Sequence, residues 1–400
     1  MKSKLTLLAL FLLSSLCAQN TWTTSTPMPN GLRGSTGFTL NNEGYVLGGI
    51  IPNVGYTNML WKYDVASSQW IQIPSPYPGC GRYKLTYFVL NNLLYVGMGS
   101  YSANGACNDW WMFDPITQQW FSRAPFPGSS RTGSSGFAIN NKGYIYGGHT
   151  FGNVYFSELY EYDPSTNTWT IKASLPSLIG GRTYAATFAT TTHGYVVGGQ
   201  YGDLNNSPIA TQEAWRYDPV LDAWSPLQAY PGTGLSPSAI SINNCHFVGL
   251  GAFSNGFWQY DIAANNWTQM QNHPSPTGTY LPFLFSVNNT AFIGCGMTST
   301  VFTSSTVYEY SPPSSCAIIT SVPQTNLHTL TQTGNQLQLQ SVIPVLKVIV
   351  FDNLGRIVYS ANPDTEIITI DLSNNPTGVY FIEIQSQSST TRKKVAVVRD

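Results

Sequence analysis

The chain contains 400 residues, of which only 9% are charged, and its formal net charge is −1. That length exceeds one ordinary compact core, so it predicts either several domains or one large repeat architecture. A net charge close to zero provides no basic surface for nucleic acid, which we exclude as the main partner. Aromatic residues make up 14% of the chain, and 36 Gly and 25 Pro separate short stretches rich in Thr, Val, Ile, Tyr and Trp. This composition is typical of an all-β protein with many short strands.

Residues 1–18 have the pattern of a signal peptide. Lys2 and Lys4 precede a short apolar run, and small residues follow it, so we expect cleavage after Ala18. A membrane-spanning helix needs about 20 apolar residues, and this run is roughly half as long. The mature chain is therefore expected to be secreted or to lie at the outer cell surface, with no transmembrane segment.

A repeat of about 50 residues occupies the chain from residue 19 to residue 312. An aromatic–Asp pair followed six residues later by Trp occurs five times, and successive Asp residues are 50, 49, 55 and 43 positions apart. This period is the one expected of β-propeller blades. A short apolar run that ends in Gly precedes each pair, and a sixth such run ends at Gly296. The five pairs are Tyr63-Asp64, Phe113-Asp114, Tyr162-Asp163, Tyr217-Asp218 and Tyr260-Asp261.

The two ends of the repeat array predict how it closes. The sixth repeat has Tyr310-Ser311 in place of the pair, and no Trp follows it, because position 317 is Ala. Trp22 stands near the mature N-terminus with no Tyr-Asp pair before it. We expect the segment around Trp22 to form the outermost strand of the last blade, since closure protects the strand edges of a propeller. Six blades are predicted, with an unrecognised seventh as the alternative.

These motifs resemble the kelch repeat, whose blade has a starting Arg, a strand that ends in Gly-Gly, a Tyr-Asp strand and a final Trp. The resemblance implies an all-β, six-bladed kelch-type β-propeller. Four arginines lie 16 or 17 residues before the last Gly of their repeats, where the family has its Arg: Arg33, Arg82, Arg131 and Arg182. Blades five and six depart from the pattern, because Gly234 and Thr279 occupy that place.

Residues 327–400 are expected to form a separate small immunoglobulin-like β-sandwich after a polar linker at 313–326. Phe351-Asp352, Gly355-Arg356 and the segments 369–372 and 377–381 together resemble the C-terminal sorting domain of the type IX (Por) secretion system of Bacteroidetes. The resemblance implies that the secretion machinery is a partner, and that the protein is released or attached at the cell surface. A plain structural sandwich is the alternative.

Five cysteines follow the signal peptide. Cys80 precedes the inner strand of blade two, and Cys107 lies in the loop after the second strand of the same blade. Both are expected on one face of that blade, so a Cys80–Cys107 disulfide is predicted in an exported protein. Cys245 and Cys295 fall at opposite ends of equivalent strands, too far apart to bridge easily. An odd total leaves at least one free thiol.

Propeller connectivity places the blade-start residues and the loops after the Gly-ended strands on one face, around the central channel. Arginines bind carboxylates and phosphates, and loop aromatics can stack on sugars, so the predicted ligand is a glycan or a protein. The alternative is that these arginines bond loop carbonyls and neighbouring blades. The candidate ligand-binding residues are Arg33, Arg82, Arg131, Arg182, Ser100, His149, Gln200 and Tyr280.

The weak catalytic candidates are three acidic residues just before the Tyr-Asp strands: Asp109, Glu158 and Glu213. Together with arginine they could transfer protons, as in the six-bladed kelch sialic acid epimerases, or they could simply anchor loops. The sequence contains no recognisable nucleophile–base pair and no converging set of metal ligands. A binding protein without cofactor or metal is therefore favoured. An epimerase-type carbohydrate-active enzyme and a structural cell-surface protein are the alternatives.

Overall fold

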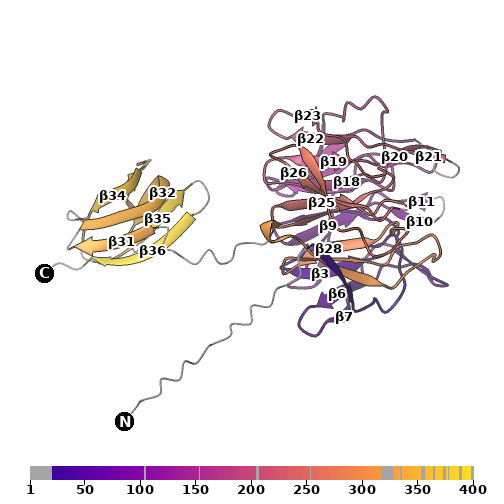
Figure 1. The fold of residues 1–400 in the computed structure, drawn as a ribbon, viewed down its shortest axis with the longest axis horizontal. Coiled ribbons are helices and arrows are strands. Elements are labelled where there is room, and N and C mark those ends of the chain that lie inside the picture. Colours follow the sequence, from indigo (N-terminus) through magenta and orange to yellow (C-terminus); the bar gives the residue numbers. More distant parts are fainter. Residues whose placement is uncertain are drawn as a thin grey trace, which may run out of the picture. The chain divides into compact units, whose positions relative to one another are not determined.

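Figure 1 shows the computed structural model, whose contacts divide the chain into two compact units, Met1–Ile318 and Ile319–Asp400. The residues that the structure describes are 20–102, 105–152, 154–203, 207–252, 254–316, 328–333, 336–352, 356–363, 365–372, 375–376, 378–386 and 390–397. The signal peptide predicted at 1–18 lies outside these residues, and so does most of the linker predicted at 313–326. Within the described ranges, no helix is long and apolar enough to cross a membrane.

Six four-stranded antiparallel sheets form the predicted six-bladed β-propeller (Figure 1). Blade one consists of β2 (Thr36–Leu40), β3 (Glu43–Leu47), β6 (Leu60–Asp64) and β7 (Gln69–Ile73). Blade two consists of β8 (Thr86–Leu90), β9 (Leu93–Gly97), β12 (Trp110–Asp114) and β13 (Gln119–Arg123). Blade three consists of β14 (Ser135–Ile139), β15 (Lys142–Tyr146), β16 (Leu159–Asp163) and β17 (Thr168–Lys172). Blades four and five consist of β18 (Ala186–Ala189), β19 (Gly194–Val197), β22 (Ala214–Asp218) and β23 (Ala223–Pro226); and β24 (Ser238–Ile242), β25 (Cys245–Gly249), β26 (Phe257–Asp261) and β27 (Asn266–Gln269). The first strands of neighbouring blades contact one another in a closed ring, so they surround the central channel.

The sixth blade joins the two ends of the propeller chain, as predicted. It consists of β28 (Phe283–Val287), β29 (Thr290–Gly294), β30 (Val307–Ser311) and the N-terminal strand β1 (Thr21–Ser25). β1 pairs antiparallel with β30, and Trp22 lies opposite Tyr310. Trp22 therefore takes the place of the tryptophan that the sixth repeat lacks.

The repeated tryptophans connect each blade to the one before it. In every blade the indole Nε1 donates a hydrogen bond of 2.8–3.2 Å to a backbone carbonyl at the end of the preceding blade. Trp22 does the same, because its Nε1 lies 2.9 Å from the carbonyl oxygen of Gln271. Each indole also packs its apolar face between two blades, which explains why a large aromatic residue with one polar atom recurs at this position.

The repeated aspartates shape the turns that lead to these tryptophans. The Asp114 carboxylate accepts a hydrogen bond from the backbone N–H of Ile116 at 2.9 Å and another from the Thr117 hydroxyl at 2.9 Å. Asp163, Asp218 and Asp261 accept the equivalent backbone bond at 2.8–2.9 Å. An Asp side chain that caps its own turn in this way replaces backbone partners that the turn cannot provide.

Unit 2 is a small β domain built around one long strand, β32 (Gln336–Phe351). The first half of β32 pairs with β31 (His328–Thr333) and β34 (Thr365–Asp371). Its second half pairs with β33 (Ile357–Ala361) and β35 (Gly378–Ser386), and β36 (Thr390–Val397) continues the sheet beyond β35. Buried aliphatic side chains from β32, β34 and β35 form the core of this domain.

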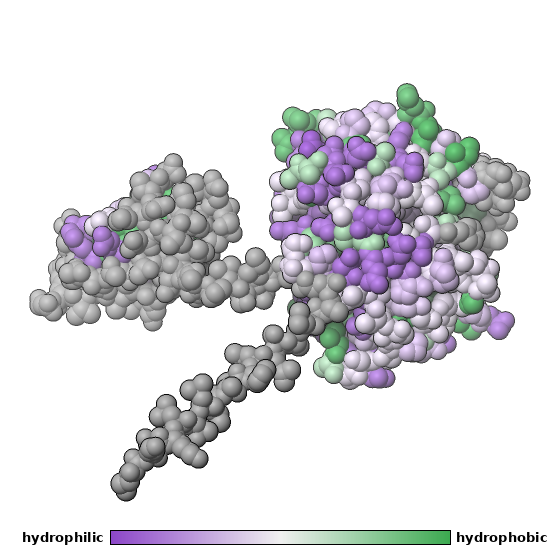
Figure 2. All heavy atoms as spheres, in the orientation of Figure 1, coloured by the Kyte–Doolittle hydropathy of each residue, from purple (hydrophilic) through white to green (hydrophobic). Residues whose placement is uncertain are grey.

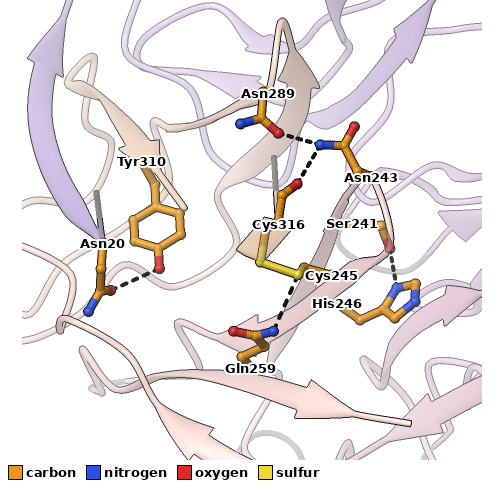
Figure 3. Close-up of a disulfide and its surroundings, with 9 residues drawn as sticks. All are labelled: Asn20, Ser241, Asn243, Cys245, His246, Gln259, Asn289, Tyr310 and Cys316. Carbon is orange, nitrogen blue, oxygen red and sulfur yellow. Dashed lines mark hydrogen bonds between the residues drawn. A yellow bond between two sulfur atoms is a disulfide. The ribbon is translucent and has the colours of Figure 1, made fainter. Parts of the chain in front are cut away.

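The disulfide differs from the one expected. The structure joins Cys245 to Cys316, which are 71 positions apart in sequence (Figure 3). Cys80 and Cys107 are thiols that contact each other side by side, so the predicted pairing is not formed in the structure although the two residues share one face of blade two. Cys316 could not be assigned from the repeat, because it follows the last blade and has no equivalent in the other five.

Candidate ligand-binding face

The loops between second and third strands emerge on one face of the propeller, together with the connections between blades; we call this the loop face. Three of these loops form small hairpins: β4 (Ile50–Ile51) with β5 (Gly55–Tyr56), β10 (Ser100–Ser102) with β11 (Gly105–Ala106), and β20 (Gln200–Asp203) with β21 (Ser207–Ala210). Figure 1 shows β10–β11 and β20–β21 projecting from the same side of the propeller. The alternating direction of the strands in each meander places all of these loops on that side.

Blades two to four each contain an ion pair between a predicted arginine and a predicted carboxylate. Arg131 Nη1 lies 2.8 Å from Glu158 Oε2, and Arg82 Nη2 lies 2.8 Å from Asp109 Oδ2. Arg182 pairs with Glu213 in the same way. The three guanidinium groups are almost fully buried, whereas about a third of each carboxylate side chain is exposed. Each arginine also donates to the backbone carbonyl of residue 98, 147 or 198 of its own blade.

Hydrogen-bond donors around Asp109 and Glu213 favour the ionised form of these two carboxylates. Burial acts to raise the pKa of Asp109, but hydrogen bonds from Arg82, Trp111 and Tyr77 outweigh it and lower the pKa below its usual value. Burial likewise opposes a lowered pKa at Glu213, where Ser177, Trp215 and Arg182 donate. A carboxylate with a lowered pKa is a weak general base and is not protonated at neutral pH, so it cannot serve as a general acid. This geometry favours the loop-anchoring role over proton transfer.

The arginine and the carboxylate occur together in a blade or not at all. The strand registers show that Leu32, Gly234 and Thr279 occupy the arginine position in blades one, five and six. The carboxylate position in those blades is occupied by Met59, Gly256 and Thr306. Removal of one member alone would leave a charge without its partner, so the pair behaves as one structural unit of the blade. The ligand-binding role of Arg82, Arg131 and Arg182 stays a prediction, and their burial and pairing count against it.

Arg33 does not belong to this set. It bridges to Ile50 in the way that Tyr83 bridges to Ser100 and Tyr280 to Met297, so it lies one residue later than the other three arginines. The same difference is visible in the sequence. Arg33 precedes the last Gly of its repeat by 16 residues, whereas each of the other three arginines precedes its Gly by 17. A shift of one residue turns a side chain to the opposite side of an extended segment.

Aromatic and sulfur atoms surround Arg33. Its guanidinium carbon lies 3.6 Å from the ring centre of Phe302 and 6.0 Å from that of Tyr83, and its Nη1 lies 3.7 Å from the Met297 sulfur. Within the described residues Arg33 forms no ion pair, and its buried Nε has no hydrogen-bond partner. Phe302 is 60% exposed. Arg33 is thus the predicted arginine whose charge is free for a ligand on the loop face.

The other predicted ligand contacts lie beside the channel, but most of them are buried or already hydrogen-bonded within the protein. Ser100, His149 and Gln200 are at most 5% exposed. His149 Nδ1 is 2.9 Å from the Thr183 hydroxyl, and burial lowers the pKa of His149 to about 4, so its ring is neutral at pH 7. Gln200 Oε1 accepts a 2.7 Å bond from Ser236. Tyr280 is only half-buried and lies close enough to Arg33 for the two to interact electrostatically.

Exposed apolar side chains also occur on the loops of this face, and sequence reasoning singled out only some of them. Figure 2 shows that apolar residues on the visible face of the propeller lie in scattered groups among polar ones, with no continuous apolar patch. A scattered distribution does not resemble the core of a large protein–protein interface. The exposed large apolar residues of the loop face are Val54, Tyr101, Phe151, Val154, Leu178, Ile209, Val301 and Phe302.

Two family models match the chain. Residues 44–252, about half of its length, match the model described as Attractin/LZTR1 beta-propeller. Residues 328–398 match the model described as secretion system C-terminal sorting domain. No curated protein matches the chain. The first match agrees with the kelch-type repeat and the six blades, and the second agrees with the sorting domain expected at the C-terminus.

Proposed function

This chain belongs to the Attractin/LZTR1 β-propeller family, and we propose that it is a binding protein that recognises a carboxylate-bearing glycan at Arg33 on its loop face. Its C-terminal sorting domain indicates secretion or export to the cell surface, where such a glycan would be encountered. The observation that carries the proposal is the unpaired guanidinium of Arg33 among aromatic rings. A guanidinium in this state can form two parallel hydrogen bonds to a carboxylate.

The surroundings of Arg33 suit a sugar acid. Phe302 is exposed and Tyr83 and Tyr280 are half-buried, so an aromatic surface lies next to the positive charge. Aromatic rings pack against the C–H groups of sugars, while the arginine takes the carboxylate. A protein ligand is supported less well, because the exposed apolar residues of the loop face are distributed over six loops.

An epimerase reaction is supported less well than binding. Asp109, Glu158 and Glu213 each hold a buried arginine of their own blade, and none of them is the partner of Arg33. Proton transfer at the Arg33 site would need an acid or base there, and its guanidinium lies next to Met297, Phe302 and Tyr83, with Tyr280 close by. Burial raises the pKa of Tyr83, so its phenol stays protonated at neutral pH and is not available as a base.

A glycan array with the mature protein tests the proposal. Arg33→Met keeps the size of the side chain and removes its charge, and Arg123→Met on the outer strand β13 is the matched control. Wild-type protein and the Arg123 variant should bind sugar acids, and the Arg33 variant should bind them about 10- to 100-fold more weakly. The same loss should follow when the glycan carboxylates are reduced to alcohols.

Two results would contradict this function. Binding of sugar acids that is unchanged in Arg33→Met would move the site elsewhere on the propeller. A wild-type protein that binds no acidic glycan would favour the structural cell-surface role, and turnover of a sugar acid would favour the enzyme.

A further inference from the structure

One residue from each blade forms a ring at the loop-face end of the central channel; we call it the channel ring. Its members follow the bridge residues of the blade starts, and all six have φ between 50° and 66°, in the left-handed region. Backbone hydrogen bonds connect the ring across blades, from Lys84 N–H to Gly34 O at 2.8 Å and from Tyr184 N–H to Gly133 O at 2.8 Å. The members are Gly34, Lys84, Gly133, Tyr184, Ser236 and Leu281.

Bulky residues in this ring need an explanation. The left-handed region suits glycine, and a lysine, tyrosine or leucine held there costs on the order of 1 kcal/mol or more. Gly133 fits without strain, and its missing side chain leaves room for the neighbouring blade, because a Cβ would lie 2.8 Å from the ring of Tyr184. Lys84 and Tyr184 therefore occupy positions where the backbone prefers glycine, and both side chains line the channel.

The channel ring borders a cavity of about 160 Å³ to which all six blades contribute. Lys84 is the one charged side chain among the described residues of its lining, and no acidic residue lines it. The Lys84 Nζ lies 5.6 Å from the ring centre of Tyr184, and no ion pair of Lys84 is found among the described residues. Lys84 is half-buried, so its ammonium loses part of its hydration without gaining an anion in return.

Most hydroxyl groups of the lining are already committed to the neighbouring blade. Thr36 donates to Leu85 O at 3.1 Å and Thr187 to Gly136 O at 2.9 Å. Ser35 is the exception, because it is 4% exposed and its Oγ has no hydrogen-bond partner. This Oγ is shielded from water, and the Ser35 Cβ lies beside Gly49 of its own blade, so Ser35 adds no donor to the cavity.

We propose that the central channel binds a small oxyanion, held by the Lys84 ammonium. An oxyanion would give this ammonium charge-assisted bonds, which are stronger than its bonds to water. Because a water occupies about 30 Å³, the cavity has room for an anion with a few waters but not for an oligosaccharide. Burial lowers the pKa of the free Lys84 to about 7, and a bound anion would favour the charged form.

The oxyanion can come from two sources that share this chemistry. One is a free inorganic anion such as phosphate or sulfate, and the other is a carboxylate of a larger ligand that reaches into the channel. The site is separate from Arg33, which bridges to Ile50 at the channel mouth and does not line this cavity. The two sites can therefore be tested independently.

The test uses the mature full chain at pH 6, where Lys84 is charged, and at constant ionic strength. Inorganic phosphate, sulfate and acetate are titrated by calorimetry and by thermal unfolding. Phosphate or sulfate should bind saturably and raise the Tm, and Lys84→Gly should abolish both effects. Ser35→Ala and Arg33→Met should both leave it unchanged, because neither side chain presents a polar atom to the cavity.

Lys84→Gly is informative because the left-handed backbone at residue 84 suits glycine, so the variant is expected to fold at least as stably as the wild type. Lys84→Met is the second variant and keeps the side-chain volume. If inorganic anions do not bind but Lys84→Gly weakens binding of a sugar acid, the carboxylate of the larger ligand is the source. Anion binding that survives in both variants, or its absence for every probe and for sugar acids, overturns the proposal.

Discussion

The blades fall into two groups that differ in the residues at two equivalent positions. Blades two to four form one group, and blades one, five and six form the other. The first three blades hold a buried arginine against a carboxylate of the same blade. The other three have no charge at either position. They contain the strand β1 that closes the ring and the disulfide that ties blade five to the end of blade six. This difference assigns the paired charges to the scaffold of their blades, and it is the reason why we propose Arg33 and Lys84, which have no such partner, as the ligand-binding charges.

Figure 3 shows how the closure side is held. Cys245 lies at the start of β25, and Cys316 follows the last propeller strand, so the disulfide fastens the point where the chain leaves the propeller. Asn243 Nδ2 donates to the carbonyl of Cys316 at 2.6 Å and also to Asn289. Tyr310 donates to Asn20 Oδ1 at 3.0 Å, which links β30 to the N-terminal segment.

The largest expected effect concerns this disulfide. Cys245→Ser with Cys316→Ser should lower the free energy of unfolding by about 3–4 kcal/mol, because the bond closes a long loop in the unfolded chain. All eleven tryptophans lie before residue 319, so Trp fluorescence in urea reports on the propeller alone.

Peptide mapping of the same protein checks the pairing. A Cys245–Cys316 peptide should be recovered, and Cys80 and Cys107 should react with an alkylating reagent before the buried Cys295 does. Recovery of a Cys80–Cys107 peptide would instead support the pairing that the sequence predicted. A wild-type protein as unstable as the double variant would contradict the role given to Cys245–Cys316.

The second largest effect is expected when a substitution breaks the ion pair of blade three. Arg131→Met should lower the free energy of unfolding by about 2–4 kcal/mol, because Glu158 loses its partner while two thirds of its side chain stays buried. Adding Glu158→Gln should recover part of this loss, since no unpaired charge then remains. Urea unfolding of the single and double variants measures the coupling between the two residues.

The Arg131→Met and Glu158→Gln variants also test whether the ion pair belongs to the scaffold or to the binding site. A double variant that regains stability and keeps its ligand shows that the pair is scaffold, as in the blades that lack it. A normal stability combined with lost ligand binding would instead assign Arg131 to the binding site.

The smallest expected effect is the pH dependence that Lys84 contributes. Its pKa is about 7 in the folded protein and about 10.4 in an unfolded chain, so the unfolded state binds more protons between these values. The contribution of Lys84 to stability should therefore rise from pH 7 to pH 9, and Lys84→Met should remove this rise. The difference between wild type and Lys84→Met isolates the contribution of Lys84. Tyr87 and Tyr184 also line the cavity, but burial raises their pKa values, so they do not titrate between pH 7 and pH 9.

The control is the same pH series in saturating sulfate. A bound anion should reduce the difference between wild type and Lys84→Met, because it stabilises the charged lysine. A pH dependence that is identical in both proteins would show that Lys84 is solvated in the channel.

Local sequence patterns predicted much of the fold for simple physical reasons. Asp114 and its equivalents bond to residues two or three positions away, so the turn is encoded within a few residues. Trp22 could be assigned to the last blade because the indole contact recurs with the repeat period. The arginines and carboxylates could be located but not paired, since residues 27 or 31 positions apart meet only when strands and loops are in register.

The sequence by itself determined the six blades, the closure by β1 and the sorting domain, because these depend on a repeated pattern and on local turns. Only the tertiary structure decided which charges are occupied. Arg33 lies one residue later in its blade than the other three arginines lie in theirs. Because of this shift its side chain contacts Phe302, whereas each of the other arginines pairs with a carboxylate. Lys84 becomes unusual only when six blades close around it, because the described lining of the cavity that they form contains no acidic side chain.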